Sequence, residues 1–129
     1  MIVDSSAIIA ILRGEKEARN CALAMEQAET LRISAANFLE TAIVIDGSRD
    51  PIASRRFDDF VKEAGLIIEG VSERQARIAR EAYRDFGKGS GHPAHLNFGD
   101  CFAYALAKTS GEPLLFVGDD FLHTDVTVA

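Results

Sequence analysis

Short apolar runs alternate along this chain with longer segments in which apolar residues recur at helical spacing. Runs of this kind, bounded by polar residues, glycine or proline, are typical of strands buried on both faces of a parallel sheet. The predicted strands span residues 1–3, 31–34, 66–71 and 114–117, with a further edge strand at residues 124–128.

Helices are predicted between these strands. The apolar residues from Phe98 to Leu106 follow the spacing of a helix that packs one face on a core, and Gly111 ends this helix. Ser72 and Gln75 have the spacing of a capping box at the start of another helix. The predicted helices span residues 5–13, 15–29, 35–46, 51–64, 72–86 and 97–110. The alternation predicts an α/β protein with one domain, residues 1–129, and a three-layer α/β/α fold around a short parallel sheet of four to five strands.

Two of these helical segments are unusually apolar. Residues 7–12 are apolar on nearly all sides, so this helix is either deeply buried or partly covered by another chain. In the segment 35–46, Glu40 shares its side of the helix with Ile43 and Val44, a pattern that offers the carboxylate no solvated face. A lone buried carboxylate is costly unless it is paired or binds a cation. Glu40 is therefore a candidate functional residue.

Composition limits the classes of protein to consider. A chain of 129 residues with 47% hydrophobic content can bury a core without disulfides, and Cys21 and Cys101 are interpreted as reduced core residues. No apolar segment reaches membrane-spanning length and no basic region precedes one at the amino terminus, so we expect a soluble, cytoplasmic protein with no membrane partner. The net charge of −6 argues against a sequence-independent nucleic-acid coat, but is compatible with a nuclease that carries its own carboxylates.

Acidic residues gather where ligands bind in open α/β sheets, outside the carboxyl ends of the strands. They are Asp4 after the first predicted strand, Glu40 on the helix after the second, Asp100 at the start of a helix, and Asp119 and Asp120 after the strand at residues 114–117. A pocket of oxygen ligands alone suits Mg²⁺ or Mn²⁺, which keep several waters and accept phosphate oxygens. Without a cation these carboxylates would repel one another. The pattern therefore predicts a divalent metal site.

Most of these acids also have a purely structural interpretation. Asp4 could cap the helix that follows it, and Asp100, three residues after Asn97, could stabilise a helix amino terminus. Asp119 and Asp120 could be ordinary turn acids. Because capping and metal binding are compatible, spacing alone leaves these alternatives open.

Two further patterns are interpreted as structural. The helix at residues 72–86 and the loop after it carry basic residues that could guide a phosphate backbone, but interleaved acids favour a plain solvated face. These residues are Arg77, Arg80, Arg84 and Lys88. His92 and His95 have no third metal ligand or nucleophile beside them in the sequence, so they are interpreted as loop residues.

Four segments together resemble motifs of the PIN-domain ribonucleases and, within them, of the VapC toxins of bacterial toxin-antitoxin modules. They are Met1–Ser6, Phe38–Glu40, Asn97–Cys101 and Gly118–Phe121. These segments follow the family's order across essentially the whole chain. The resemblance implies an acidic quartet, with a small polar residue lining the site. By position the quartet is Asp4, Glu40, Asp100 and Asp119, and the polar residue is Ser6.

The chain departs from the family pattern near its end. Phe116 stands where many PIN domains have Thr or Ser, and Asp119 and Asp120 are adjacent. The resemblance therefore leaves open which of these two acids faces the metal. It implies that Asp4 and Asp100, with that pair, hold one or two Mg²⁺ ions, with Mn²⁺ as a substitute.

The resemblance also implies a function. The protein is expected to be a metal-dependent endoribonuclease that hydrolyses RNA, often a tRNA in this family, and so inhibits translation. Glu40 would hold a metal-bound water or orient the nucleophile. A cognate VapB-type antitoxin would hold the enzyme inactive, and the toxin would form a homodimer. We expect the apolar helix at residues 7–12 to supply part of the partner contact.

Two other classes fit the sequence less well. A phosphoacceptor receiver domain requires an Asp at the end of the third strand and a Lys after the last, and neither Val71 and Ser72 nor the segment 124–129 supplies them. A catalytically silent PIN domain that acts only as a binding module would have lost an acid. All of the acids are present, which argues against that alternative.

Overall fold

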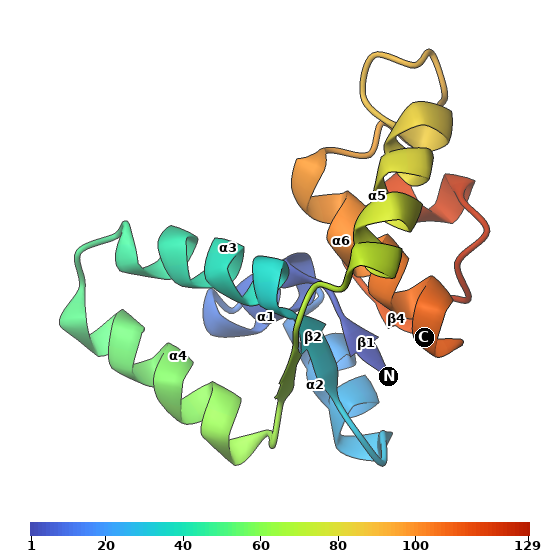
Figure 1. The fold of residues 1–129 in the computed structure, drawn as a ribbon. Helices are drawn as coiled ribbons and strands as arrows, with labels where there is room; N and C mark the ends of the chain where they lie inside the picture. Colours follow the sequence, from blue (N-terminus) through green and yellow to red (C-terminus); the bar gives the residue numbers. More distant parts are fainter.

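The computed structural model describes all residues, 1–129. A four-stranded parallel sheet lies at its centre, with strand order β3-β2-β1-β4 (Figure 1). The strands are β1 (Ile2–Val3), β2 (Arg32–Ser34), β3 (Ile67–Glu69) and β4 (Leu114–Leu115). The predicted parallel sheet is therefore confirmed, although most strands are shorter than expected. The predicted edge strand at residues 124–128 is reduced to one isolated parallel bridge between Val128 and Leu114.

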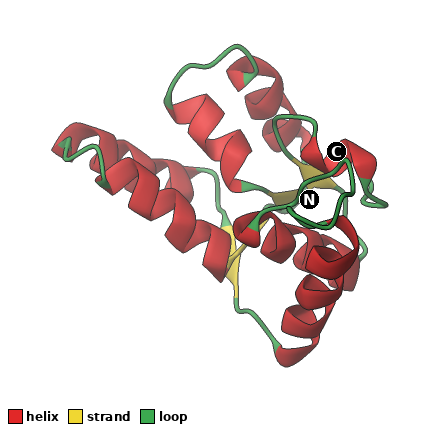
Figure 2. Ribbon diagram, turned by 90° about the horizontal axis from the view of Figure 1, so that it is seen from above, coloured by secondary structure: helices red, strands yellow, loops and turns green.

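Six α-helices and one 3₁₀ helix surround the sheet. They are α1 (Ser5–Leu12), α2 (Ala18–Gln27), α3 (Ala35–Asp46), α4 (Pro51–Glu63), α5 (Glu73–Phe86), α6 (Phe98–Ser110) and η1 (Asp120–His123). The α3–α4 pair projects to one side of the sheet, and α5 and α6 pack together on the other (Figure 1). Figure 2 shows the short strands lying between the groups of helices. None of the helices combines the length and the apolar character needed to cross a membrane.

The sheet separates two hydrophobic clusters. Ile2 and Leu114 belong to a cluster with α5 and α6, whereas the next residues, Val3 and Leu115, belong to a cluster with α1, α2 and α4. Successive residues of a strand point to opposite faces, so β1 and β4 each contribute to both clusters and read as continuous apolar runs.

The other two strands are less completely buried. Ile33 of β2 belongs to the second of these clusters alone. The expectation of burial on both faces is wrong for the edge strand β3, where Ile67 and Ile68 are exposed. Helices on both faces of the sheet confirm the predicted three-layer arrangement.

Local capping fixes where the helices begin. The side chain of Ser72 accepts a hydrogen bond from the Gln75 amide (3.1 Å), which is one half of the predicted capping box. A box with both halves present lies instead at the start of α6, between Asn97 and Asp100. Gly111 ends α6 in the left-handed conformation at φ 66°, where a side chain would be strained.

The apolar helix α1 is covered mainly by its own chain. Ala7, Ile8 and Ala10 are fully buried, because α1 packs against α2 and α3. Large exposed apolar side chains lie instead on the α3–α4 pair: Leu39 (57% exposed), Ile43 (62%), Val44 (36%) and Ile52 (72%). Of the two alternatives left open for α1, the structure supports burial in the core of the same chain.

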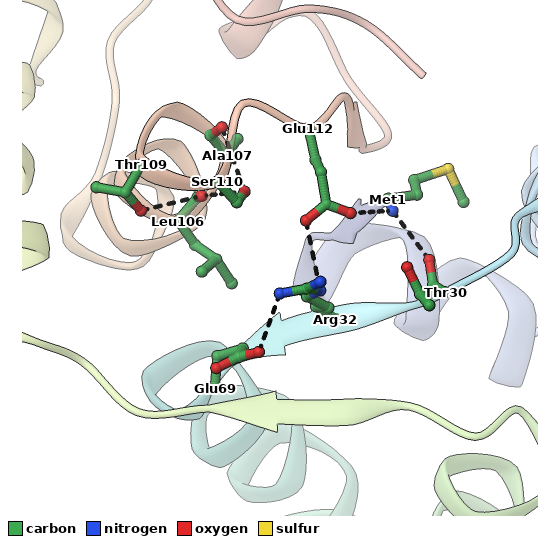
Figure 3. Close-up of polar contacts among 9 residues, drawn as sticks. All are labelled: Met1, Thr30, Arg32, Glu69, Leu106, Ala107, Thr109, Ser110 and Glu112. Atoms are coloured by element: carbon green, nitrogen blue, oxygen red, sulfur yellow. Dashed lines mark hydrogen bonds and ion pairs between the residues drawn. The ribbon is translucent and has the colours of Figure 1, made fainter.

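A polar network links β1, β2, β3 and the turn between α6 and β4 (Figure 3). Arg32 of β2 pairs with Glu69 of β3 (3.3 Å) and, through Nε, with Glu112 (3.4 Å). The amino group of Met1 donates to Glu112 (2.7 Å) and to the Thr30 carbonyl (2.9 Å). The Met1 hydrogen bond lowers the pKa of Glu112. These bonds hold β1, β2, β3 and the α6–β4 turn together, away from the strand ends that carry the acids.

Candidate active site

The predicted acids lie at the carboxyl ends of the strands. Asp4 directly follows β1, Glu40 is on α3, Asp100 is in the first turn of α6, and Asp120 begins η1. The negative charges of Asp4, Asp120 and Glu40 each raise the pKa of Asp100. The fold therefore gathers acids that are up to 116 residues apart in the sequence (Asp4 to Asp120) into one electrostatic cluster.

Asp4 is buried, with 4% of its surface exposed, and it caps α1. Its carboxylate accepts hydrogen bonds from the Ser6 amide (3.0 Å) and the Ser6 hydroxyl (2.6 Å). The same hydroxyl accepts a bond from the Val117 amide (2.9 Å). Burial raises the pKa of Asp4, the Ser6 bonds oppose that rise, and the charge of Glu40 adds to it. Ser6 thus links Asp4 to the chain that leaves β4.

Glu40 is held by polar contacts. Its carboxylate accepts a bond from the Ser5 hydroxyl (2.6 Å) and a longer one from the Asn37 amide (3.4 Å). The sequence argument that Ile43 and Val44 would deny it solvent was wrong, because these two residues are themselves exposed and Glu40 is only half-buried. A Cβ added at Gly99 would overlap the Glu40 carboxyl group. Glu40 therefore rests directly against the first turn of α6.

Asn37 was not singled out from the sequence, yet it joins the elements of the site. It is fully buried, and its side-chain amide donates to the Gly99 carbonyl (2.9 Å) as well as to Glu40. Its backbone carbonyl accepts bonds from Ser5 (3.1 Å) and Thr41 (2.8 Å). Its side-chain oxygen is buried without a partner. An asparagine within an apolar helical segment was the signal that could have identified it.

Asp100 both caps α6 and belongs to the cluster. Its carboxylate accepts a bond from the Asn97 amide (3.0 Å), and the Asn97 side chain accepts one from the Asp100 amide (2.9 Å). Burial raises the pKa of Asp100 to about 7, helped by the neighbouring carboxylates and opposed by the bond from Asn97. The structure therefore confirms the capping role of Asp100 and is compatible with its predicted role as a metal ligand.

The two adjacent acids after β4 differ in their electrostatic effect on Asp100. Asp119 and Asp120 are both exposed, and the charge of Asp120 acts on Asp100. Phe116 packs its ring against Phe121, with centroids 5.1 Å apart, so an aromatic contact anchors the start of η1. This arrangement favours Asp120 as the acid that faces the site.

The donor atoms fit a hydrated hard cation. No three His, Cys, Asp or Glu side chains converge closely enough to enclose a metal ion by themselves. Mg²⁺ usually keeps several waters and is bound through one or two carboxylates, so it does not need a closed cage. Burial, with a smaller effect of neighbouring carboxylates, raises the pKa of Asp4 and of Asp100, and a bound cation would favour their charged forms. Asp4, Asp100 and Asp120 could thus hold Mg²⁺ or Mn²⁺ partly through water.

The two cysteines and His92 have structural roles. Both cysteines are free and buried, as predicted, and Cys101 donates a weak bond to the Asn97 carbonyl (3.3 Å). His92 accepts a bond from the Ala94 amide within its own loop (3.1 Å) and packs on Phe86. These contacts are structural, and His92 does not take part in the acidic cluster.

Comparison with known proteins places this geometry in context. A family model described as the PIN domain matches residues 1–126. Ribonuclease VapC28 of Mycobacterium tuberculosis is 59% identical over 126 residues, which cover 98% of this chain and 95% of that protein. Two solved structures share the fold. M. tuberculosis VapC20, described as a sarcin-ricin loop cleaving toxin, superposes with a TM-score of 0.76 at 14% identity, over 99% of this chain and 97% of the other. A toxin-antitoxin complex from Klebsiella pneumoniae gives 0.74 at 17% identity, over 99% and 95%.

Proposed function

The chain belongs to the PIN-domain family and, within it, to the VapC ribonucleases, and from this we propose that it is the Mg²⁺-dependent endoribonuclease toxin of a VapBC-type module. The observation that carries the proposal is the electrostatic cluster of Asp4, Glu40, Asp100 and Asp120 at the carboxyl ends of the strands. Acids whose pKa values are raised by burial and mutual repulsion are typical of functional sites. The reaction is hydrolysis of an RNA phosphodiester bond.

The position of each residue in the site suggests its role in the reaction. Mg²⁺ or Mn²⁺, when bound, neutralises the phosphate oxygens and makes water more acidic. Asp4 and Asp100, with Asp120, hold the cation, and Ser6 fixes the orientation of Asp4. Glu40 orients the attacking water and accepts its proton. Because the chain carries a net charge of −6, RNA phosphates would be repelled from the acids unless a cation neutralised them.

The physiological substrate is a structured cytoplasmic RNA, such as a tRNA, whose cleavage stops translation. The name of the VapC relative supports an RNA substrate, and the toxin-antitoxin complex of the same fold supports the role of a toxin. The choice of a tRNA and the effect on translation rest on the resemblance to the VapC family alone. A cognate VapB-type antitoxin neutralises the enzyme.

Two surfaces suit protein partners. The α3–α4 pair carries four large exposed apolar side chains, Leu39, Ile43, Val44 and Ile52, and these suit a homodimer contact because a second copy could bury them. A groove of about 480 Å³ beside α2 and α4 is lined mainly by apolar residues, together with Glu26, Glu29 and Glu63. This lining suits an antitoxin segment that carries both apolar and basic residues.

The test uses the purified chain and total RNA from its host, with mapping of the RNA ends. Cleavage is expected with Mg²⁺ or Mn²⁺, and is expected to stop with EDTA or in the Glu40→Gln variant. Asp46→Asn, on the exposed end of the same helix, is the matched control and is expected to cleave normally. Cleavage that EDTA leaves unchanged would refute the metal mechanism, and absence of RNA cleavage by the wild-type protein under all these conditions would refute the proposed activity.

A further inference from the structure

A small apolar groove lies between α5 and α6, beside the acidic cluster. It has a volume of about 290 Å³ and is lined mainly by Ala76, Arg80, Tyr83, Phe98 and Phe102. Phe98 is 78% exposed, and Phe102 meets its ring edge to face at a centroid distance of 4.9 Å. The apolar groove and the exposed ring together make this surface a candidate binding site.

The groove also holds a cation that has no partner. On α5, Arg77 pairs with Glu73 (3.4 Å) and Arg84 with Asp85 (3.4 Å). Arg80, in contrast, forms no ion pair or side-chain hydrogen bond in the structure, although it lines the groove. The sequence interpretation of a plain solvated face therefore fits Arg77 and Arg84 but not Arg80.

The groove adjoins the site at the amino terminus of α6. Phe98 and Asp100 both belong to the first turn of this helix, about 3 Å apart along its axis, but side chains two residues apart leave a helix on different sides. Cys101, the residue after Asp100, lines the groove, whereas none of the clustered acids does. An RNA strand with a phosphate at the carboxylates would therefore have to pass around the amino terminus of α6 to place its neighbouring base in the groove.

We propose that this groove binds one unstacked nucleobase next to the scissile phosphate, with the base stacked on Phe98 and Arg80 paired with an adjacent phosphate. The inference rests on the proposed function. Proteins recognise single-stranded RNA by stacking splayed bases on aromatic rings and arginine planes. An enzyme with an acidic site and a net negative charge needs such contacts, because its carboxylates do not attract RNA.

The size and charge of the groove favour a base over a protein. Ligand pockets span roughly 300–1,000 Å³, so this groove suits a single ring system. A stable interface with another protein buries roughly 800 Å² on each side, which is more than one such groove offers. It would also leave Arg80 without a counter-charge unless the partner supplied one.

The first experiment is a kinetic cycle on the full-length protein. The substrate is a single-stranded oligoribonucleotide that spans the mapped cleavage position, made with the natural bases or with one abasic site at each flanking position. The variants are Phe98→Leu, which keeps apolar bulk, Phe98→Tyr, which keeps an aromatic ring, and Arg80→Gln. Melting temperature and Mg²⁺-induced stabilisation are measured for each, and both are expected to match the wild type.

Phe98→Leu is expected to raise KM by about 5-fold to 150-fold, which is the factor expected for the loss of one base–aromatic stack. Phe98→Tyr keeps an aromatic ring and is expected to have the KM of the wild type. One abasic position should weaken wild-type binding by a similar factor and have no further effect in Phe98→Leu. Arg80→Gln should raise KM and reduce the dependence of KM on salt. Equal KM values for wild type and Phe98→Leu would overturn the proposal, as would abasic effects of the same size in both proteins.

A binding measurement separates this inference from the proposed activity. A uridine oligoribonucleotide with one 2-aminopurine is titrated with Glu40→Gln in Mg²⁺, and stacking on Phe98 is expected to quench the fluorescence. Loss of quenching in the double variant with Phe98→Leu supports the groove even if the wild type cuts no RNA. Quenching that persists in that double variant contradicts the proposal. A lower molecular mass of Phe98→Leu by light scattering, with KM unchanged, would also refute it and assign the groove to a second copy of the chain.

Discussion

Replacing Asp100 with Asn separates the cost of gathering acids from the benefit of capping a helix. The folded protein raises the pKa of Asp100 from 3.8 to about 7, mainly through burial. At ~1.4 kcal/mol for each pKa unit, this rise sets an upper bound of about 4 kcal/mol on the destabilisation by the charged form. Solvent reaches part of the half-buried side chain and screens its charge, so we expect about 1–2 kcal/mol.

The direction with pH follows from the raised pKa. Below about pH 4 Asp100 is protonated in both the folded and the unfolded state, so it has no charge penalty. As the pH rises from about 4 to about 7, the unfolded chain loses this proton first, and the folded state is progressively destabilised. Asn keeps a hydrogen-bond acceptor for Asn97 but loses about 0.3–1 kcal/mol of helix-dipole interaction. The variant should therefore be more stable than wild type by about 1 kcal/mol at pH 8, and equal to it near pH 4.

The assay is urea and thermal unfolding in EDTA between pH 4 and pH 8, repeated with Mg²⁺. A gain of about 1 kcal/mol corresponds to a Tm rise of about 2–6 °C for a domain of this size. Mg²⁺ should stabilise the wild type by binding its folded state and Asp100→Asn far less. Asp50→Asn is the control, because Asp50 is an exposed amino-terminal cap of α4 outside the cluster, and Asn caps helices equally well. An Asp100→Asn variant that melts lower than wild type in EDTA at pH 8, yet keeps the full Mg²⁺ shift, would refute the reasoning.

Three further substitutions test how the acids are positioned. Gly99→Ala should lower kcat by tenfold or more and change Tm only slightly, because a Cβ at this position would displace the Glu40 carboxyl group. An unchanged kcat would mean that RNA cleavage does not need this contact. Asn37→Leu should lower the free energy of unfolding by about 1–3 kcal/mol, because the Gly99 carbonyl loses its hydrogen-bond donor. The same variant should have a lower kcat. Urea unfolding measures the first effect and single-turnover RNA cleavage the second, and a loss of stability alone would limit Asn37 to a structural role. Ser6→Ala should destabilise the folded protein by about 1–3 kcal/mol and weaken Mg²⁺ binding, because Asp4 loses the hydroxyl that orients it. Thermal shift with and without Mg²⁺ measures both effects. Ser6→Thr keeps the hydroxyl and should retain the stability and the Mg²⁺ binding of the wild type.

The identity of the fourth acid was the main question that the motif left open. Asp119 and Asp120 are adjacent and both suit a turn, so no pattern in the sequence distinguishes them. Their relation to Asp100 depends on how the chain turns after β4, and that turn is set by the packing of Phe116 on Phe121 and by the Ser6 bond to Val117. The path of the chain that carries these two carboxylates therefore depends in part on a bond between residues 111 positions apart in the sequence.

The sequence by itself determined the elements whose causes are local. Strand runs, helix spacing and the residues that end helices, such as Gly111, placed the α/β architecture and its parallel sheet, because these signals act within a few residues. The rule that ligands bind at the carboxyl ends of parallel strands was enough to select Asp4 and Asp100 together.

Only the tertiary structure decided what depends on contacts between distant segments. It buried α1 within its own chain and left Ile43 of α3 exposed, although both segments are apolar in sequence, because burial depends on which faces meet the sheet. It placed Glu40 against Gly99 and joined them through Asn37, across about 60 residues of sequence. It also left Arg80 without a partner, since a charge pattern along one helix does not show which pairs form.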